Sequence, residues 1–165
     1  MKQLWLVRHA KSSWDSADLS DFERPLNERG KKAAPEMGRR LAKRKLKLDR
    51  IVTSPARRAF DTAFAIADAL DFPVHLLAVE PRIYEASVKT LLDVVATQPE
   101  DCERVMLVGH NPGFSELADR LSPDGMDELP TCAVVALKFQ VKHWREVARK
   151  RADSVYYDYP KKDAD

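Results

Sequence analysis

Short apolar runs rich in Val, Ile and Leu recur along the chain and alternate with segments of helical periodicity. Runs of this length, bounded by polar residues, are typical of buried strands. Because strands and helices alternate at short spacing, the pattern predicts βαβ units and a largely parallel sheet. The predicted strands cover residues 4–7, 50–54, 74–79, 104–110 and 133–139.

Helix signals fill the intervals between these strands. Ser54 and Ser87 have side chains that are preferred at an N-cap, and Pro55 suits the first helical position. Pro35 is likewise expected in a first turn, where its missing N–H costs nothing. The predicted helices cover residues 35–46, 54–70, 87–98 and 112–122.

The end of the chain predicts an antiparallel edge to the sheet. Segments 133–140 and 143–150 lie close enough in sequence to form a hairpin. The tyrosines within 156–159 indicate a C-terminal strand that packs on the domain. Residues 160–165 are expected to form a frayed tail.

Length and composition indicate one globular domain. A chain of 165 residues that is 44% hydrophobic can bury a core without a metal or disulfide staple. The net charge of +2 argues against a polycation adapted to nucleic acid. Cys102 and Cys132 lack the spacing of a metal or redox motif, so inert core thiols and a cytoplasmic location are expected. We expect a monomeric three-layer α/β/α sandwich over residues 1–159, with a mainly parallel sheet and neither a signal peptide nor a membrane span.

Polar and cationic residues follow three of the predicted strands. Arg8 and His9 end the first, and His110 ends the fourth. The second ends at Ser54 and leads into a helix whose first turn holds Arg57 and Arg58. In open α/β sheets ligands bind beyond the carboxyl ends of the strands, so these side chains are expected at one edge. Arginines and helix N-termini bind phosphate, whereas cationic neighbours disfavour a metal. The pattern therefore predicts a phosphate site that uses no metal and no other cofactor.

These residue types suit phosphoryl transfer. A neutral imidazole is a competent nucleophile toward phosphorus, and nearby positive charge favours the neutral form. Phosphoryl transfer otherwise depends mostly on positioned cations. His9 as the nucleophile supplies the first part, and the oxygens would be held by Arg8, Arg58 and His110.

Four segments resemble motifs of the histidine phosphatase (phosphoglycerate mutase-like) superfamily. "LVRHAKSSWD" is similar to its RHG motif, "RPLNERGKKAA" to its PLTxxGxxQA segment, "TSPARRAFDTA" to its SPxxRAxxTA segment and "LVGHNPG" to its second-histidine segment. The short length and the RHAKS variant look most like the SixA-type phosphohistidine phosphatase branch. The resemblance implies a phosphoglycerate mutase-like fold in which His9 becomes phosphorylated and the pocket is completed by Arg8, Arg58 and His110. Arg57 is then a solvated first-turn cation, since Arg58 stands where the family has its second arginine.

Further candidate residues surround this set. Lys11, Ser12 and Asn111 are expected to help bind phosphate or substrate. The family's proton donor is usually a Glu or Asp after the third strand, and "RIYEAS" places Glu85 there. The alternative is that Lys11, Ser12 and Glu85 are ordinary surface residues. Ala10 replaces the family's glycine, which is tolerable if the backbone there keeps a negative φ.

The expected activity is that of a metal-independent phosphatase acting on phosphohistidine of proteins through a phosphohistidine intermediate. A small-molecule phosphomonoesterase, a phosphomutase and a catalytically idle phosphate-binding module are the alternatives. The basic segment 39–50 also raises nucleic-acid binding, although its cations are expected on the solvated face of a helix. We therefore expect a phosphorylated protein or a small phosphorylated metabolite as the partner, and neither nucleic acid nor a membrane.

Overall fold

A six-stranded sheet runs through the centre of the molecule in the computed structural model, which describes residues 1–160. The strands are β1 (Lys2–Arg8), β2 (Arg50–Thr53), β3 (Ala78–Val79), β4 (Arg104–Gly109), β5 (Val134–Phe139) and β6 (Ser154–Asp158). Their order across the sheet is β3-β2-β4-β1-β5-β6. The parallel pairs are β1 with β4, β4 with β2, and β2 with β3. β5 pairs antiparallel with β1 and with β6. The expectation of a mainly parallel sheet is confirmed.

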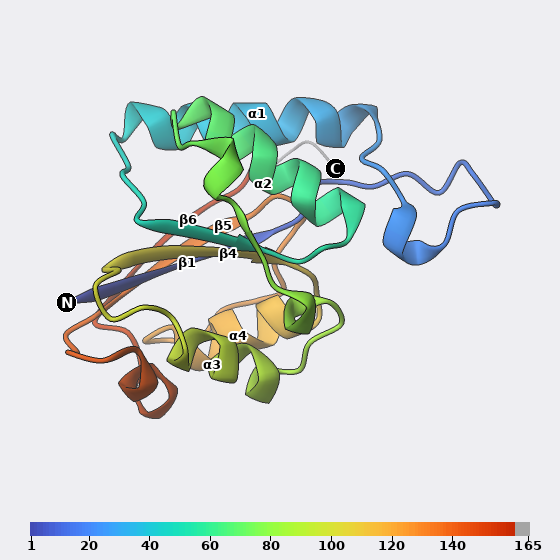
Figure 1. Ribbon diagram of the computed structural model, residues 1–165. Coiled ribbons are helices and arrows are strands. Elements are labelled where there is room, and N and C mark those ends of the chain that lie inside the picture. The colour runs from blue at the N-terminus through green and yellow to red at the C-terminus, as the bar shows by residue number, and fades with distance from the viewer. Residues whose placement is uncertain (161–165) are drawn as a thin grey trace.

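Helices cover both faces of this sheet (Figure 1). α1 (Glu28–Lys43) and α2 (Arg57–Ala69) lie on one face, whereas α3 (Val88–Ala96) and α4 (Gly113–Leu121) lie on the other. Short 3₁₀ helices occur in the connections, namely η1 (Asp21–Glu23), η2 (Val74–Leu76), η3 (Pro81–Ile83) and η4 (Trp144–Arg149). The structure is the predicted three-layer α/β/α sandwich.

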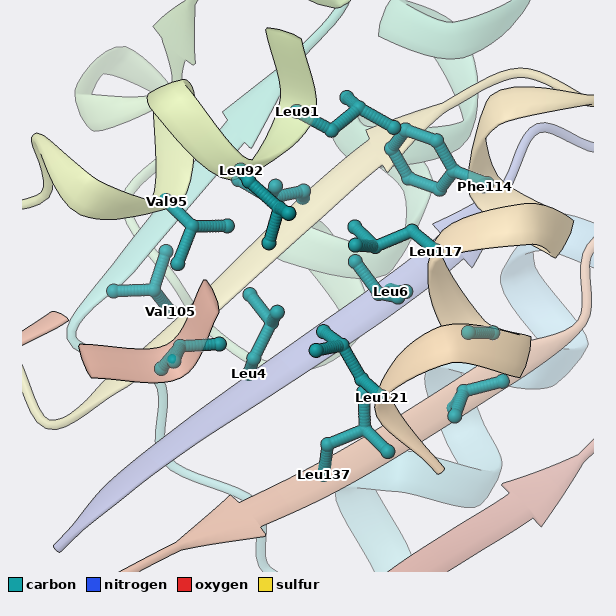
Figure 2. Close-up of a cluster of buried hydrophobic side chains, with 14 of the residues drawn as sticks. Leu4, Leu6, Leu91, Leu92, Val95, Val105, Phe114, Leu117, Leu121 and Leu137 are labelled. Atoms are coloured by element: carbon teal, nitrogen blue, oxygen red, sulfur yellow. The ribbon is translucent and has the colours of Figure 1, made fainter. Parts of the chain in front are cut away.

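Alternating residues of β1 supply both halves of the core. Leu4 and Leu6 belong to the cluster under α3 and α4, while Trp5 and Val7 belong to the cluster under α1 and α2. Figure 2 shows the first cluster, in which Leu4 and Leu6 are surrounded by side chains of both helices. Full burial stabilises the fold by roughly 1.5–3 kcal/mol for each large aliphatic side chain. The central strand is therefore held from both sides, which fixes the position of its carboxyl end.

α1 begins earlier than the sequence predicts. Asn27 caps the helix, because its side-chain oxygen accepts a hydrogen bond of 2.9 Å from the Gly30 amide. Pro35, expected in the first turn, therefore lies inside the helix. The prediction was wrong because buried side chains on both sides of the proline, including Ala34 and Leu41, pack on the core. Such packing outweighs the single backbone hydrogen bond that a proline removes.

α2 begins later than predicted, at Arg57 rather than directly after Ser54. Ala56 occupies the N-cap position, and its amide donates a hydrogen bond of 3.2 Å to the Ser54 hydroxyl. The Ser54 hydroxyl also lies 2.8 Å from the ring of His110, so this residue belongs to the site instead of a helix cap. Ser87 does cap α3, as predicted.

Two of the predicted strands are wrong in part. Residues 74–76 form η2, because their side chains are exposed rather than buried in the sheet, and β3 is only two residues long. Residues 143–150 were expected to pair with β5, but most of this segment forms η4. Trp144 and Val147 are both buried there, at the three-residue spacing of a 3₁₀ turn. The edge strand that pairs antiparallel with β5 is instead β6, which contains the predicted tyrosine-rich strand.

Both cysteines are free thiols. Cys132 is completely buried, which raises the pKa of its thiol to about 12, whereas Cys102 is half-buried. No helix within residues 1–160 combines the length and the apolar character needed to cross a membrane. Of the tail predicted at 160–165, all but Pro160 lies outside the described residues.

Candidate active site

The carboxyl ends of β1 and β4 bring the two predicted histidines together. These strands are neighbours in parallel register, with Arg8 opposite Gly109. His9 and His110 therefore leave adjacent strands at the same level, and their ring centroids lie 5.2 Å apart. Both residues are buried, with exposed fractions of 8% and 7%. Two imidazoles at this separation can contact one tetrahedral anion.

The backbone fixes which ring nitrogen of His9 carries the proton. Nδ1 lies 2.7 Å from the carbonyl oxygen of Ala10, and a carbonyl only accepts hydrogen bonds, so Nδ1 is the donor. The lone pair is then on Nε2. Burial lowers the pKa of His9, the Ala10 hydrogen bond opposes this, and the nearby charges of Arg58, Arg8 and Arg24 add to the lowering, so that the pKa is about 4. His9 is therefore neutral near pH 7, with a nitrogen lone pair available for attack.

His110 is oriented by a hydroxyl at the end of β2. Its Nε2 lies 2.8 Å from Ser54 Oγ, which already accepts a hydrogen bond from the Ala56 amide. The one hydrogen of the Ser54 hydroxyl can then go to Nε2, which leaves the ring proton on Nδ1. That Nδ1 is buried and has no hydrogen-bond partner within residues 1–160, so it is available to a ligand oxygen. Burial and the adjacent His9 lower the pKa of His110 to about 3.

Two of the predicted arginines flank the imidazoles. Arg8 donates from Nη1 to the Leu129 carbonyl at 2.8 Å, and its buried Nε has no partner in the described part of the chain. Arg58 is 6% exposed and donates from both Nη atoms to Asp21. Arg57, by contrast, is exposed and forms an ion pair of 3.6 Å one turn along α2, as predicted for a solvated cation. We call the group formed by Arg8, His9, Arg58 and His110 the cationic cup.

A third guanidinium, which sequence reasoning missed, comes from the segment between β1 and α1. Arg24 is 7% exposed, donates to Asp21 Oδ1 at 2.7 Å and also donates to the Ser12 hydroxyl. Its guanidinium stacks on Trp14, 3.3 Å from the ring centroid. The signal in the sequence was an Asp and an Arg three residues apart, a spacing that one helical turn brings together. Figure 1 shows this segment, in blue, extending beyond the sheet.

Tyr84 joins the site without having been predicted. Its hydroxyl donates to Asp21 Oδ2 at 2.6 Å, and its ring lies edge-on to His110 with 5.5 Å between the centroids. Phe22 contacts the same tyrosine, at 5.2 Å between centroids. The Tyr84 hydrogen bond lowers the pKa of Asp21 to about 2, and the Asp21 carboxylate raises the pKa of Tyr84 to about 12. Near neutral pH the pair is therefore a carboxylate and a neutral phenol.

The loop directly after His9 has mostly structural contacts. The backbone at Ala10 does not have a positive φ, so an alanine is tolerated here in place of glycine. The Ala10 amide donates to Thr62 Oγ1 at 2.9 Å. Lys11 is exposed, and Ser12 is half-buried with its hydroxyl bound to Arg24. Phosphate contacts for Lys11 and Ser12 stay predictions.

Asn111 and Glu85 lie beside the cup. The amide of Asn111 donates to the Leu129 carbonyl at 3.0 Å, and its oxygen accepts from the Ser115 hydroxyl at 2.7 Å, so it holds the start of α4. Glu85 is exposed and has a φ of 55°. Its carboxylate has no hydrogen-bond partner within residues 1–160 and adjoins the site through Tyr84. Neither side chain is part of the cup, and their predicted roles stay predictions.

The cup combines a nucleophilic nitrogen with two buried N–H groups, Arg8 Nε and His110 Nδ1, that have no hydrogen-bond partner within residues 1–160. Guanidinium and imidazole N–H groups at such a site stabilise the charge on phosphoryl oxygens. Within residues 1–160, no three His, Cys, Asp or Glu side chains are grouped so as to hold a metal ion. Arg8, Arg24 and Arg58 supply positive charge around the nucleophile.

Comparison with known families agrees with this geometry. Residues 4–91, just over half of the chain, match the model of the histidine phosphatase superfamily (branch 1). The chain belongs to this superfamily. The matched range contains His9 and Arg58, whereas His110 lies beyond it and reaches the site through the sheet.

Solved structures place this histidine phosphatase near the SixA proteins. The putative phosphohistidine phosphatase SixA from Agrobacterium tumefaciens is 27% identical, with a TM-score of 0.77 over 94% of this chain and 97% of that one. The protein histidine phosphatase SixA complexed with tungstate shares the fold, with a TM-score of 0.76, 22% identity, and coverage of 95% of this chain and 94% of that one. The expected phosphoglycerate mutase-like fold and the resemblance to the SixA-type branch are confirmed.

A sequence relative points to the same type of activity. Phosphoserine phosphatase 1 from Hydrogenobacter thermophilus is 34% identical over 121 residues, which cover 69% of this chain and 55% of that protein. Together with the superfamily, this similarity identifies a phosphatase-type enzyme.

Proposed function

We propose that this histidine phosphatase hydrolyses phosphohistidine in proteins, without a metal, through a covalent intermediate on Nε2 of His9. One observation carries the proposal. The hydrogen bond of 2.7 Å from His9 Nδ1 to the Ala10 carbonyl leaves the lone pair on Nε2, in a ring held neutral by burial. The unpaired N–H groups of Arg8 and His110 lie around the same site and support binding of the transferred group.

The proposed cycle has two steps. First, the Nε2 lone pair of His9 forms a bond to phosphorus while the bond from phosphorus to the leaving nitrogen breaks, and that nitrogen keeps the electron pair and takes up a proton. Arg8, Arg58 and His110 hold the three phosphoryl oxygens. Water then attacks phosphorus, the P–Nε2 bond breaks, and inorganic phosphate leaves with neutral His9 restored.

The supply of protons favours an imidazole leaving group. An alkoxide is strongly basic and needs a general acid, whereas the conjugate acid of imidazole has a pKa of about 6.5 and imidazole leaves far more easily. Asp21, the carboxylate bound to Arg58, has its pKa lowered to about 2 by the Tyr84 hydroxyl, so it holds no proton near pH 7. Glu85 at the rim is then the candidate proton donor. A site with few groups that can donate a proton to the leaving group is suited to phosphohistidine.

A phosphomonoesterase for small metabolites is the second candidate function. The observation that favours it is the relative named phosphoserine phosphatase, which is 34% identical. In this case Glu85 would protonate the departing alkoxide and then activate water. The two candidates therefore differ in how strongly they depend on Glu85.

A substrate panel tests both candidates. The kcat/KM of the wild-type chain would be measured on a phosphohistidine protein, on phosphoserine and on sugar phosphates, and compared with Glu85→Gln. We expect the highest kcat/KM on phosphohistidine and less than about threefold loss there in Glu85→Gln, because imidazole needs little help to leave. Glu103→Gln, an exposed carboxylate before β4, is the control. A preference for alkyl esters that Glu85→Gln abolishes would identify the second function instead.

Trapping the intermediate tests the mechanism. Rapid acid-free quenching with labelled substrate should leave acid-labile phosphate on wild-type protein and none on His9→Ala. A His9→Ala protein that retains turnover would falsify the covalent route. Wild-type protein that binds substrate, traps no label and releases no phosphate would be the idle phosphate-binding module.

A further inference from the structure

Asp21 binds three side chains of the site at once. Its Oδ1 accepts from Arg24 Nη1 at 2.7 Å, and its Oδ2 accepts from Arg58 Nη2 at 3.0 Å and from the Tyr84 hydroxyl at 2.6 Å. Its backbone carbonyl accepts from Arg58 Nη1 at 2.6 Å. The two guanidinium side chains are only 9% and 8% exposed, so a single residue on η1 fixes both of them from the solvent side.

We propose that Asp21 is the positioning residue of the cationic cup. Its carboxylate and carbonyl set the orientation of Arg58, and its carboxylate holds Arg24 in place, so that both guanidiniums present their remaining N–H groups toward the anion bound at His9. This inference rests on the proposed function and deepens it. It assigns a role to a residue on the loop between β1 and α1, outside the strand ends.

The hydrogen bonds to Asp21 leave each guanidinium with donors to spare. A guanidinium has five N–H groups. Arg58 uses two of them on Asp21, and Arg24 uses three on Asp21, the Ser13 carbonyl and the Ser12 hydroxyl. A bound phosphoryl group can therefore be gripped while Asp21 stays in place, which distinguishes a positioning role from an inhibitory plug that the substrate must displace.

Asp21 is also unsuited to donating protons. Its carboxyl is ionised near neutral pH because the Tyr84 hydroxyl and the two guanidiniums all favour the charged form. A permanent carboxylate beside an anion site has an electrostatic cost, since it repels the phosphoryl group. Asp21 favours anion binding only if the orientation of Arg58 and Arg24 contributes more binding free energy than this repulsion removes.

Charge and orientation predict opposite signs for Asp21→Asn. Removing one negative charge should strengthen anion binding if electrostatics alone matter. Losing the fixed orientation of two arginines should weaken it. We expect weaker binding by about tenfold or more, which is the scale of one lost charge-assisted hydrogen bond.

The probe is tungstate, an oxyanion whose binding to the full chain requires no turnover. Its Kd would be measured by calorimetry for wild type, Asp21→Asn and Glu23→Gln. Glu23 lies on the same 3₁₀ helix and contacts Ser20 rather than an arginine, so its variant has the same charge change without the arginine contacts. We expect Glu23→Gln to bind tungstate within about twofold of wild type. Equal or tighter binding by Asp21→Asn would overturn the positioning role.

Asp21→Glu covers the case in which Asp21→Asn does not fold. It keeps the charge but moves the carboxylate by one methylene, so weaker tungstate binding supports positioning and unchanged binding contradicts it. Turnover gives an independent readout, because a positioning residue for a transferred group should lower kcat as well as raise KM, whereas general destabilisation of the fold lowers only the amount of active enzyme. If wild type binds tungstate but hydrolyses nothing, the proposed function fails while the binding test of Asp21 still stands.

Discussion

The protonation state of a single side chain decides what the cup can do. A protonated His9 has no lone pair, and its neutrality follows from burial first and from the neighbouring guanidiniums second. The Ala10 carbonyl then selects which nitrogen holds the remaining proton. The burial that keeps this imidazole neutral for attack on phosphorus also opposes its protonation in the folded state. The stability of the fold should therefore depend on the protonation of His9.

That link predicts how stability depends on pH. The pKa of His9 is about 4 in the folded chain and about 6.5 when unfolded, so between these values the unfolded chain binds a proton that the folded chain does not. Stability is full above pH 6.5 and falls as the pH is lowered through this window. We expect the loss in free energy of unfolding between pH 7 and pH 5 to be smaller in His9→Gln than in wild type by about 2 kcal/mol. Urea denaturation at both pH values measures it, with the exposed His75→Gln as the control.

Equal losses in wild type and His9→Gln would contradict the prediction. They would mean that the imidazole reaches water in the folded state. His110 keeps in both proteins the lowering of its pKa that comes from burial, whereas His9→Gln removes the part that comes from His9.

Whether a site residue could be predicted from the sequence depends on the element that carries it to the cup. Arg8 ends β1, and His9 and His110 directly follow β1 and β4, so the strand-end rule finds all three. Arg58 lies in the first turn of α2, where the rule also offered Arg57 and the motif resemblance selected Arg58. Arg24, Asp21 and Tyr84 arrive on connecting segments, whose paths depend on contacts between residues far apart in the chain. Nothing local in the sequence specifies the hydrogen bond between Tyr84 and Asp21, which are 63 positions apart.

At the scale of elements, α1 helps to place the loop that follows His9. Gly30, in the first turn of α1, packs against the backbone of Lys11, and a Cβ on this glycine would lie 2.2 Å from the Lys11 carbonyl oxygen. The same carbonyl accepts a hydrogen bond of 3.0 Å from the Asn27 amide. The start of the helix and the loop after β1 are therefore one packed unit, and a side chain at position 30 would separate them.

Gly30→Ala should accordingly weaken both the fold and the site. The added methyl forces the Lys11 backbone away, and overpacking of this kind costs typically about 1–3 kcal/mol. Because Ser12, next in the chain, is bound to Arg24, we also expect weaker tungstate binding. Thermal unfolding and calorimetry measure the two effects, and the exposed Lys32→Ala on the same helix is the control. A Gly30→Ala protein with wild-type stability and affinity would show that the loop can shift freely.

The element predictions failed where side-chain burial and backbone propensity disagree. The apolar run at 74–79 suggested a strand, but its first residues are exposed and form η2. The segment at 143–150 resembled a strand because it follows β5 closely, whereas the burial of Trp144 and Val147 together requires a turn of helix. Burial depends on the whole fold, so neither outcome was visible in the local sequence. The order of strands and helices, which depends on periodicity over longer segments, was predicted well.

At the scale of the molecule, positive charge from three arginines is gathered at one edge of the sheet. Helices cover both faces of the sheet, and the site lies at the carboxyl ends of β1, β2 and β4 (Figure 1). Arg8, Arg24 and Arg58 surround this edge in a chain whose net charge is only +2. These three guanidiniums are therefore a local concentration of positive charge in a chain whose total charge is small.

Metal removal should then leave the activity unchanged. After exhaustive treatment with a chelator, we expect kcat/KM within about twofold of the untreated protein, because in the proposed mechanism arginines take the place that a divalent ion has in metal-dependent phosphatases. The assay compares chelated protein with and without added Zn²⁺ or Mg²⁺. Loss of activity on chelation that either ion restores would show that the guanidiniums are not sufficient.

The position of β4 in the sheet also determines when the fold can form during synthesis. β4 lies between β1 and β2 in the sheet but follows both in the chain. While a ribosome is making the first hundred or so residues, the strand that lies between β1 and β2 is missing, and the edges that face it stay open to other chains. A nascent polypeptide that lacks β4 and His110 cannot place both imidazoles around one anion, and the second edge of β1 stays open until β5 has also been made.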